Sequence, residues 1–593
     1  MTTQPEIHDD ISLREIIAAY PQARAVMAKY GLMECGGSAG PDEPLGWFAR
    51  VHQVDIEQLK QELHAAIALG NAPASSGSHA EPATTDAALD ADGLFRRFLV
   101  TAVALTLTGG VLWGAINLTL IAYHHHFVSW LAAGTQAHAH VQIFGWCALF
   151  IMGIAYHVIP RLKAAPLQHV ALGYASFWLM AGGVLLHAFY RPFMDNPVLA
   201  PFPIFAGLLE LAGVLAFTVV IVATMRKGST PPDLSDKYLV AGTIGFVLMA
   251  LMNVVMLSYM AVMHTAVLPE QWNWATYHLQ LYGFIVFFIF GVSLRTLPVF
   301  LGKPQPDARF DRVIFPALVA GILLRSAGEV LAQEGIVSST LLLIPSVLEG
   351  TAILAFTWNL GVFKRQHDSL AGIPDAARAY ERYLYAGYGW LTAATVGITT
   401  LTVCRALAGQ PTPHALMGSY MHALTVGFIS IMILGYSMRT LPIFLGRQVH
   451  SVRLLNATFV LMMIGCTLRV VFQALTVPFG IWPFAVAGMS GWVEAVGLAL
   501  YGYNLLWTIY AREAPVPQRA DAIDPNAIAG TLTVARLVEL YPQTVAVLLA
   551  MGFEPLANPV LRQTLGKRIT LEAAAQIKHI PLDDLLHRLR EVA

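Results

Sequence analysis

The hydrophobic positions of the chain form long runs that polar residues rarely interrupt. A run of about 20 apolar residues is the length that an α-helix needs to cross the hydrocarbon core of a bilayer. Twelve such runs predict twelve transmembrane helices, near residues 97–121, 136–160, 168–190, 201–225, 239–263, 275–299, 313–333, 340–363, 382–405, 414–442, 453–475 and 483–508. The pattern therefore predicts an all-α, polytopic membrane protein.

One stretch within this pattern occurs three times. It begins HVQIFG at residue 140, HLQLYG at 278 and HALTVG at 422. Each copy has His first, Gly five and thirteen residues later, and Pro twenty residues later. A register shared by three segments indicates an internal repeat. The copies begin 138 and 144 residues apart, so we predict three tandem four-helix repeats, at about 97–225, 239–363 and 382–508.

Ionisable residues recur in the same register inside the apolar runs. Forty-seven residues after each His come His187, Arg325 and Arg469. About seventy residues after each His come Glu210, Glu349 and Glu494. Such residues are costly within a bilayer and usually pair with one another or serve function.

Several interpretations of these residues stay open. A histidine at the start of each copy could ligate a metal or haem, or bond to a neighbouring carbonyl. From their predicted depths we expect Arg325 to pair with Glu349, and Arg469 to pair with Glu494, as structural pairs or as part of a site. Two further arginines, Arg295 and Arg439, lie seventeen residues into their copies, where a long side chain can reach the membrane interface.

The polar ends of the chain predict two small helical domains. The phrases LREIIAAYPQARAVMAKYG and TVARLVELYPQTVAVLLAMG share Tyr-Pro-Gln. Residues 71–92 are rich in Ala, Ser, Thr and Pro, as in a flexible linker. The phrase REAPVPQRADAIDP indicates a second linker on the other side of the apolar body. The predicted division is a domain at 1–70, a linker at 71–94, the membrane domain at 95–510, a linker at 511–526 and a second domain at 527–593.

Charge predicts the orientation and excludes some classes of partner. The basic residues of the loops fall mainly on one side of the predicted helices, so the positive-inside rule predicts that both termini and both end domains are cytoplasmic. The polar N-terminus predicts no cleavable signal peptide. A net charge of −1 with only 12% charged residues gives no reason to expect nucleic acid as a partner. The four scattered cysteines predict neither a disulfide framework nor a cysteine zinc site.

The histidines on predicted helices 2, 6 and 10 resemble those of subunit I of the haem–copper oxidases and nitric oxide reductases. Helix 7, FPALVAGILLRSAGEVL, lacks the paired histidines of those enzymes, so dioxygen reduction is not expected. The phrase His138-Ala139-His140, followed by Phe144-Gly145, more closely resembles the NnrS family. That family comprises twelve-span relatives of the oxidases that are linked to haem, copper and the response to nitric oxide.

The end domains resemble the N-terminal domain of ScdA-type iron–sulfur repair proteins. That domain usually ends in a cysteine-containing Gly-Gly turn, which Cys35-Gly36-Gly37 matches. Cys35 is therefore a redox candidate. The C-terminal domain has Phe553-Glu554-Pro555 instead.

The resemblance implies a haem protein, with copper as a second candidate metal, in an inner membrane. Its expected partners are the lipid bilayer, nitric oxide and cytoplasmic redox or repair proteins that bind the end domains. The implied haem site comprises His140, His278, His422, Arg325 and Arg469. The candidate metal ligands are His138, His140, His278 and His422. The expected buried charge partners are Glu210, Glu349, Glu494, His187, Arg295 and Arg439.

Two alternatives to this function remain. The protein could be a degenerate oxidase-like or nitric oxide reductase-like subunit that transfers electrons, since its histidine pattern is similar. It could also be a proton- or anion-coupled transporter, because buried histidine, arginine and glutamate residues line such pathways. Whether it is an enzyme stays open.

Overall fold

The protein is described here by a computed structural model. The described residues are 7–32, 40, 41, 43–70, 91–127, 132–336, 339–364, 378–410, 412–510, 528–541, 544–553, 556 and 569–592. Over these ranges the regular structure is helical, apart from two isolated bridges, Ser12–Pro44 and Thr533–Thr570. The chain forms two compact units, residues 1–511 and 512–593.

Twelve helices among the described residues are long and apolar enough to cross a membrane. The predicted all-α membrane fold with twelve spans is therefore confirmed, and most span boundaries lie within a few residues of the prediction. The spans, in chain order, are Gly93–His124, Ala132–Leu162, Val170–Phe193, Pro201–Arg226, Leu234–Val262, Trp272–Phe300, Ala308–Ala332, Leu343–Leu360, Glu381–Leu407, His414–Phe444, Val452–Phe479 and Trp482–Tyr510.

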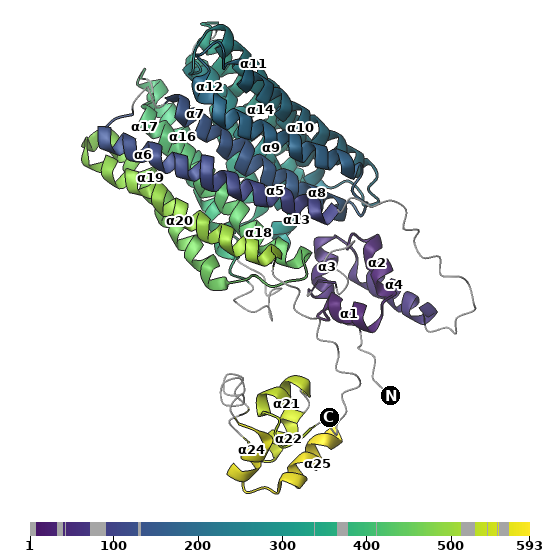
Figure 1. Ribbon diagram of the computed structural model, residues 1–593. Coiled ribbons are helices and arrows are strands. Elements are labelled where there is room, and N and C mark those ends of the chain that lie inside the picture. The colour runs from purple at the N-terminus through teal and green to yellow at the C-terminus, as the bar shows by residue number, and fades with distance from the viewer. Residues whose placement is uncertain are drawn as a thin grey trace. The chain divides into compact units, whose positions relative to one another are not determined.

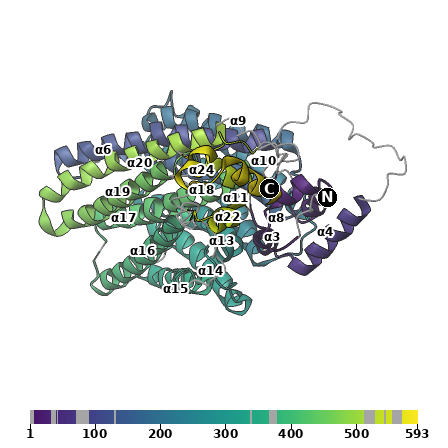
Figure 2. The same cartoon turned by 90° about the horizontal axis from the view of Figure 1, so that it is seen from below.

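Spans 2, 6 and 10 form the interior of the membrane domain. The share of the most apolar window that is buried is 94%, 89% and 56% in these spans, against at most 50% in the others. The other nine spans form a ring around them, and most neighbouring helices of the ring contact one another. These outer helices are α5 (Ala91–Leu105) continuing into α6 (Val111–His124), α9 (Val170–Tyr190), α10 (Pro201–Arg226), α11 (Leu234–Val262), α14 (Ala308–Gln333), α15 (Leu343–Leu360), α16 (Glu381–Leu407), α19 (Val452–Phe479) and α20 (Trp482–Tyr510). Contacts between α20 and α6 close the ring, and both helices lie side by side in Figure 1 and Figure 2.

Each inner span changes its winding directly after the histidine that begins a copy. Span 2 runs from α7 (Ala132–His140) through the π-helical segment η4 (Val141–Ala148) into α8 (Leu149–Leu162). Spans 6 and 10 have the same build. Their parts are α12 (Glu270–His278), η6 (Leu279–Val286) and α13 (Phe287–Phe300), then α17 (His414–His422), η10 (Ala423–Ser430) and α18 (Ile431–Phe444). π-Helical segments are rare and frequently mark functional sites.

The N-terminal domain consists of α1 (Leu13–Ala19), α2 (Ala23–Lys29), α3 (Leu45–Val51) and α4 (Ile56–Gly70). Ser12 begins α1 with a capping box, in which its side chain and that of Glu15 bond to each other's backbone N–H. The domain has its own apolar core, to which α1, α2, α3 and α4 all contribute. Trp47 of α3 belongs instead to the core of the membrane domain, so α3 attaches the two parts to each other.

The second unit is described by itself. It contains α21 (Val534–Leu540), α22 (Thr544–Ala550), α24 (Leu571–Ile577) and α25 (Leu582–Val592) around a small apolar core. Its local structure resembles that of the N-terminal domain: Thr533 caps α21 and bridges to Thr570, as Ser12 caps α1 and bridges to Pro44. Both first helices end at a tyrosine, Tyr541 or Tyr20, whose N–H bonds to the carbonyl four residues before.

Candidate functional site

His140, at the end of α7, belongs to a buried cluster with His187 of α9 and Glu210 of α10. Its Nε2 lies 2.7 Å from Oε1 of Glu210 in a hydrogen bond. The two imidazole rings stack with centroids 3.4 Å apart and an interplanar angle of 11°. Asn253 of α11 donates to the other carboxylate oxygen of Glu210 over 2.8 Å. The cluster therefore orients Glu210 through both of its oxygens.

His278 forms the equivalent bond in the second copy, where Nε2 lies 2.7 Å from Oε2 of Glu349. Arg325 donates to Glu329 of its own helix over 2.8 Å, and also to the Ser346 hydroxyl. The expected Arg325–Glu349 ion pair is therefore wrong, because Glu349 bonds to the histidine and Arg325 bonds to Glu329. Glu329 is four residues after Arg325 and therefore lies on the same helix face.

The second and third copies meet through two tyrosines. The hydroxyl of Tyr282, four residues after His278, lies 2.6 Å from the hydroxyl of Tyr420 on α17. The rings of Tyr282 and His278 lie 4.9 Å apart at an angle of 36°. This bond connects the surroundings of His278 to the helix that carries His422.

The third copy lacks the histidine–glutamate bond. Nδ1 of His422 bonds instead to the Gly418 carbonyl over 2.8 Å. Glu494 and Arg469 are buried, with 7% and 9% of their surface exposed. Their charges interact, but Nε and Nη1 of Arg469 and Oε1 of Glu494 have no hydrogen-bond partner among the described residues.

His138 of α7, in the first copy, lies near His422 and Arg469 of the third copy. Its Nδ1 bonds to the Gly110 carbonyl over 2.8 Å, and it interacts electrostatically with both His422 and Arg469. Gly114 makes room for its ring, since a Cβ there would lie 2.6 Å from the ring carbon Cε1. We call His138, His422, Arg469, Gln473 and Glu494 the third-copy pocket.

The third-copy pocket is the best candidate for binding a cofactor. A ligating histidine commonly bonds through one ring nitrogen to a carbonyl or carboxylate, which fixes the tautomer and leaves the other nitrogen for the metal. His138 and His422 both show this pattern with a backbone carbonyl. A buried polar atom without a partner is rare and needs an explanation, and Arg469, Gln473 and Glu494 all have one. A metal centre would satisfy the histidines, and an acidic group would satisfy the guanidinium group of Arg469. The side-chain oxygens of Gln473 and Glu494 accept hydrogen bonds and need a donor instead.

The arginines near the other end of the inner spans contact the N-terminal domain. Arg439 of α18 donates to Glu43 over 2.8 Å, and its guanidinium group lies 5.0 Å from the centre of the Trp47 ring. Arg295 of α13 pairs with Asp233 and donates to the His52 carbonyl over 3.5 Å. Burial opposes ionisation of the Asp233 carboxyl, but Arg295, Ser235 and Lys163 outweigh burial and lower its pKa.

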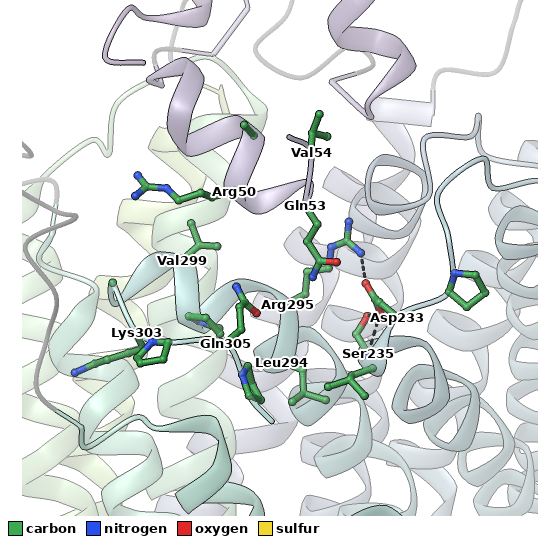
Figure 3. A pocket seen from close by; sticks show the side chains of 17 residues that line it. Arg50, Gln53, Val54, Asp233, Ser235, Leu294, Arg295, Val299, Lys303 and Gln305 are labelled. Carbon is green, nitrogen blue, oxygen red and sulfur yellow. Dashed lines mark hydrogen bonds and ion pairs between the residues drawn. The ribbon is translucent and has the colours of Figure 1, made fainter. Parts of the chain in front are cut away.

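A cavity of about 1070 Å³ opens beside this contact. Figure 3 shows Arg50 and Gln53 above it, with Arg295, Asp233 and Lys303 below. The interpretation of Arg295 and Arg439 as interface anchors missed this arrangement, because the short acidic partners in the loops carried no pattern.

Sequence reasoning identified the ionisable residues that recur in register but missed several of their polar neighbours, among them Asn253 and Gln473. Asn253 is a single polar residue in an apolar span, and Gln473 follows Arg469 by four residues. The helical spacing could have revealed Gln473. Cys35 lies outside the described residues.

The fold and the clusters define a polytopic α-helical membrane protein that buries histidine–carboxylate sites among its helices. Residues 94–510 match the family model of the NnrS protein, and the chain therefore belongs to the NnrS family. Residues 528–586 match a domain of unknown function, DUF1858. No curated protein matches the chain.

Proposed function

We propose that this protein binds haem in the third-copy pocket and acts in the response to nitric oxide. We further propose that it lies in an inner membrane with both termini cytoplasmic, as the loop charges favour. The observation that carries the haem proposal is the pair of buried nitrogens without partners on Arg469, beside two histidines anchored through Nδ1.

Haem offers what the two histidines and Arg469 lack. Its iron accepts an imidazole nitrogen, and its propionates accept hydrogen bonds from a guanidinium group. His138 and His422 would hold the iron, and Arg469 would pair with a propionate. The surroundings favour His138 over His140 as the partner of His422, because His138 interacts electrostatically with His422, whereas His140 belongs to the separate cluster with His187 and Glu210. When bound, haem supplies a centre for electron transfer or for binding of a diatomic gas.

The number of histidines that hold the iron decides between electron transfer and binding of a diatomic gas. If His138 and His422 both hold the iron, the site would favour electron transfer, whereas a single histidine ligand would leave a position for nitric oxide. Gly114 makes room for the His138 ring. Arg469 lies buried beside the site with two guanidinium nitrogens that have no hydrogen-bond partner among the described residues, which favours a polar group of the cofactor over a lipid chain. The link to nitric oxide rests on family membership.

Absorption spectra of the purified protein test the haem proposal. Wild-type protein from haem-supplied cells should show a Soret band, and His422→Ala and His138→Ala should each remove most of it. His414→Ala is a matched control, because His414 begins the same helix as His422 but is exposed. A wild-type protein without a Soret band, or full absorbance in both variants, would overturn the proposal.

Proton-coupled transport is the second candidate function. The histidine–glutamate bonds of the first two copies and the Tyr282–Tyr420 bond are groups that can carry protons through a helix bundle. Growth of a deletion strain separates the candidates. The haem proposal expects a growth defect only with a nitric oxide donor, whereas loss of ion uptake without that defect favours transport.

A further inference from the structure

We propose that His140, His187 and Glu210 form a separate mononuclear site for a divalent first-row transition-metal ion. This site lies in the first copy and does not depend on haem binding in the third-copy pocket. Neither the family model nor the fold assigns it.

The geometry brings three suitable donor atoms together. One ligand atom from each of the three residues lies within 4.8 Å of the other two. The three residues come from α7, α9 and α10, and their exposed fractions are only 7%, 2% and 0%. Two imidazole nitrogens and one carboxylate oxygen suit ions such as Zn²⁺, Fe²⁺ or Cu²⁺. Three protein ligands also leave positions on the ion for water or another small ligand.

The neighbouring side chains orient these donors. The ring of His140 stacks on His187 and also on Phe144, with centroids 4.4 Å apart. Asn253 occupies Oε2 of Glu210, which directs Oε1 towards the two imidazoles. Hydrogen bonds of this kind to a ligating carboxylate are typical of metal sites.

One donor atom in the cluster lacks a hydrogen bond. Nδ1 of His187 is buried without a hydrogen-bond partner among the described residues. It lies 3.6 Å from Oε1 of Glu210, which is too long for a hydrogen bond. A histidine that served only packing would bond this nitrogen, whereas a metal ion between the two atoms would satisfy both.

The buried negative charge of Glu210 also favours a cation in this cluster. Among the described residues only His140 and His187 form ion-pair contacts with Glu210. At the equivalent position of the other copies, forty-seven residues after the first histidine, the chain has Arg325 and Arg469. The first copy thus has a second imidazole where the others have a fixed positive charge. A buried carboxylate needs such a charge, and a divalent ion bound by two neutral imidazoles provides it.

A proton shared by His140 and Glu210 is the competing source of positive charge. It would balance Glu210 but would leave Nδ1 of His187 without a bond. The metal ion accounts for both observations, and the two interpretations differ in metal content.

The variant His187→Arg provides a sharp test, because it installs the residue found in the other copies. Purified wild-type protein should contain one equivalent of a transition metal in excess of its haem iron by mass spectrometry, and His187→Arg should lose most of this excess while folding normally. Titration of metal-free protein with Co²⁺ should give visible d–d absorption bands in wild type but not in His187→Arg or Glu210→Gln.

The spectra also separate this site from the haem pocket. His187→Arg should keep the Soret band, and His422→Ala should keep the metal, so that failure of one proposal leaves the other intact. Equal metal content and equal Co²⁺ spectra in wild type and His187→Arg would overturn the proposed site. A wild-type protein that takes up neither metal nor Co²⁺ would also overturn it and would assign the positive charge to a proton.

Discussion

Three glutamates in equivalent register have two different kinds of partner. Glu210 and Glu349 bond to the histidines that begin their copies, whereas Glu494 does not bond to His422. The sequence placed these residues at compatible depths, but depth does not determine pairing. Each residue turns an α-helix by about 100°, so one position decides which neighbour a side chain meets. The π-helical segments change this direction further, and the hydrophobic pattern did not reveal them.

The effect of replacing a glycine also depends on which neighbour its side-chain position faces. A Cβ on Gly245 of α11 would lie 1.7 Å from the Gly283 carbonyl oxygen in η6, a backbone atom. A Cβ on Gly182 of α9 would meet nothing within 4 Å. Both glycines lie inside apolar spans, so composition does not distinguish them.

We expect Gly245→Ala to destabilise the protein by about 1–3 kcal/mol or more, because α11 must move away from η6. Gly182→Ala is the control and should change stability by no more than about 1 kcal/mol. Thermal unfolding followed by size-exclusion chromatography measures both. Equal stability of the two variants would contradict the close contact between α11 and η6.

Among the elements, the spans were predictable and the attachment of the N-terminal domain was not. The spans were predictable because any apolar run of about 20 residues is long enough to cross the bilayer. The attachment depends on α3, a helix of seven residues, whose Trp47 stacks on Phe300 with centroids 6.4 Å apart. A helix of only seven residues, LGWFARV, is too short to give a periodic signal.

We expect the Glu43–Arg439 pair to hold α3 on the membrane domain. Both side chains are largely buried, and a hydrogen bond between charged groups contributes about 1.5–3 kcal/mol. Glu43→Arg should therefore weaken docking roughly tenfold or more, and the double variant Glu43→Arg with Arg439→Glu should recover part of it. Hydrogen exchange of α3 measures docking, and equal protection in all variants would contradict this role.

For the whole molecule, docking should respond to pH through His52 at the end of α3. Burial, Arg295 and Arg161 lower the pKa of His52 from 6.5 to about 3. The facing groups are these two arginines, with Asp233 paired to Arg295. The docked domain therefore contains a neutral imidazole, whereas a free domain takes up a proton below its ordinary pKa.

We expect docking to be strongest above pH 6.5 and to weaken as the pH falls from there towards 3. The loss approaches about 1.4 kcal/mol for each pH unit below 6.5. Hydrogen exchange of α3 at neutral pH and at about pH 5 measures it. His52→Gln cannot take up the proton and should show a flatter dependence. An unchanged pH profile in that variant would assign the effect to other groups.

The π-helical segments of the three inner spans also carry information about the history of the chain. Each begins at the same place, directly after His140, His278 or His422. Three independent changes of winding at one position are far less economical than a single change inherited by every copy. If the copies descend from one four-helix unit, that unit already had its histidine beside a π-helical turn.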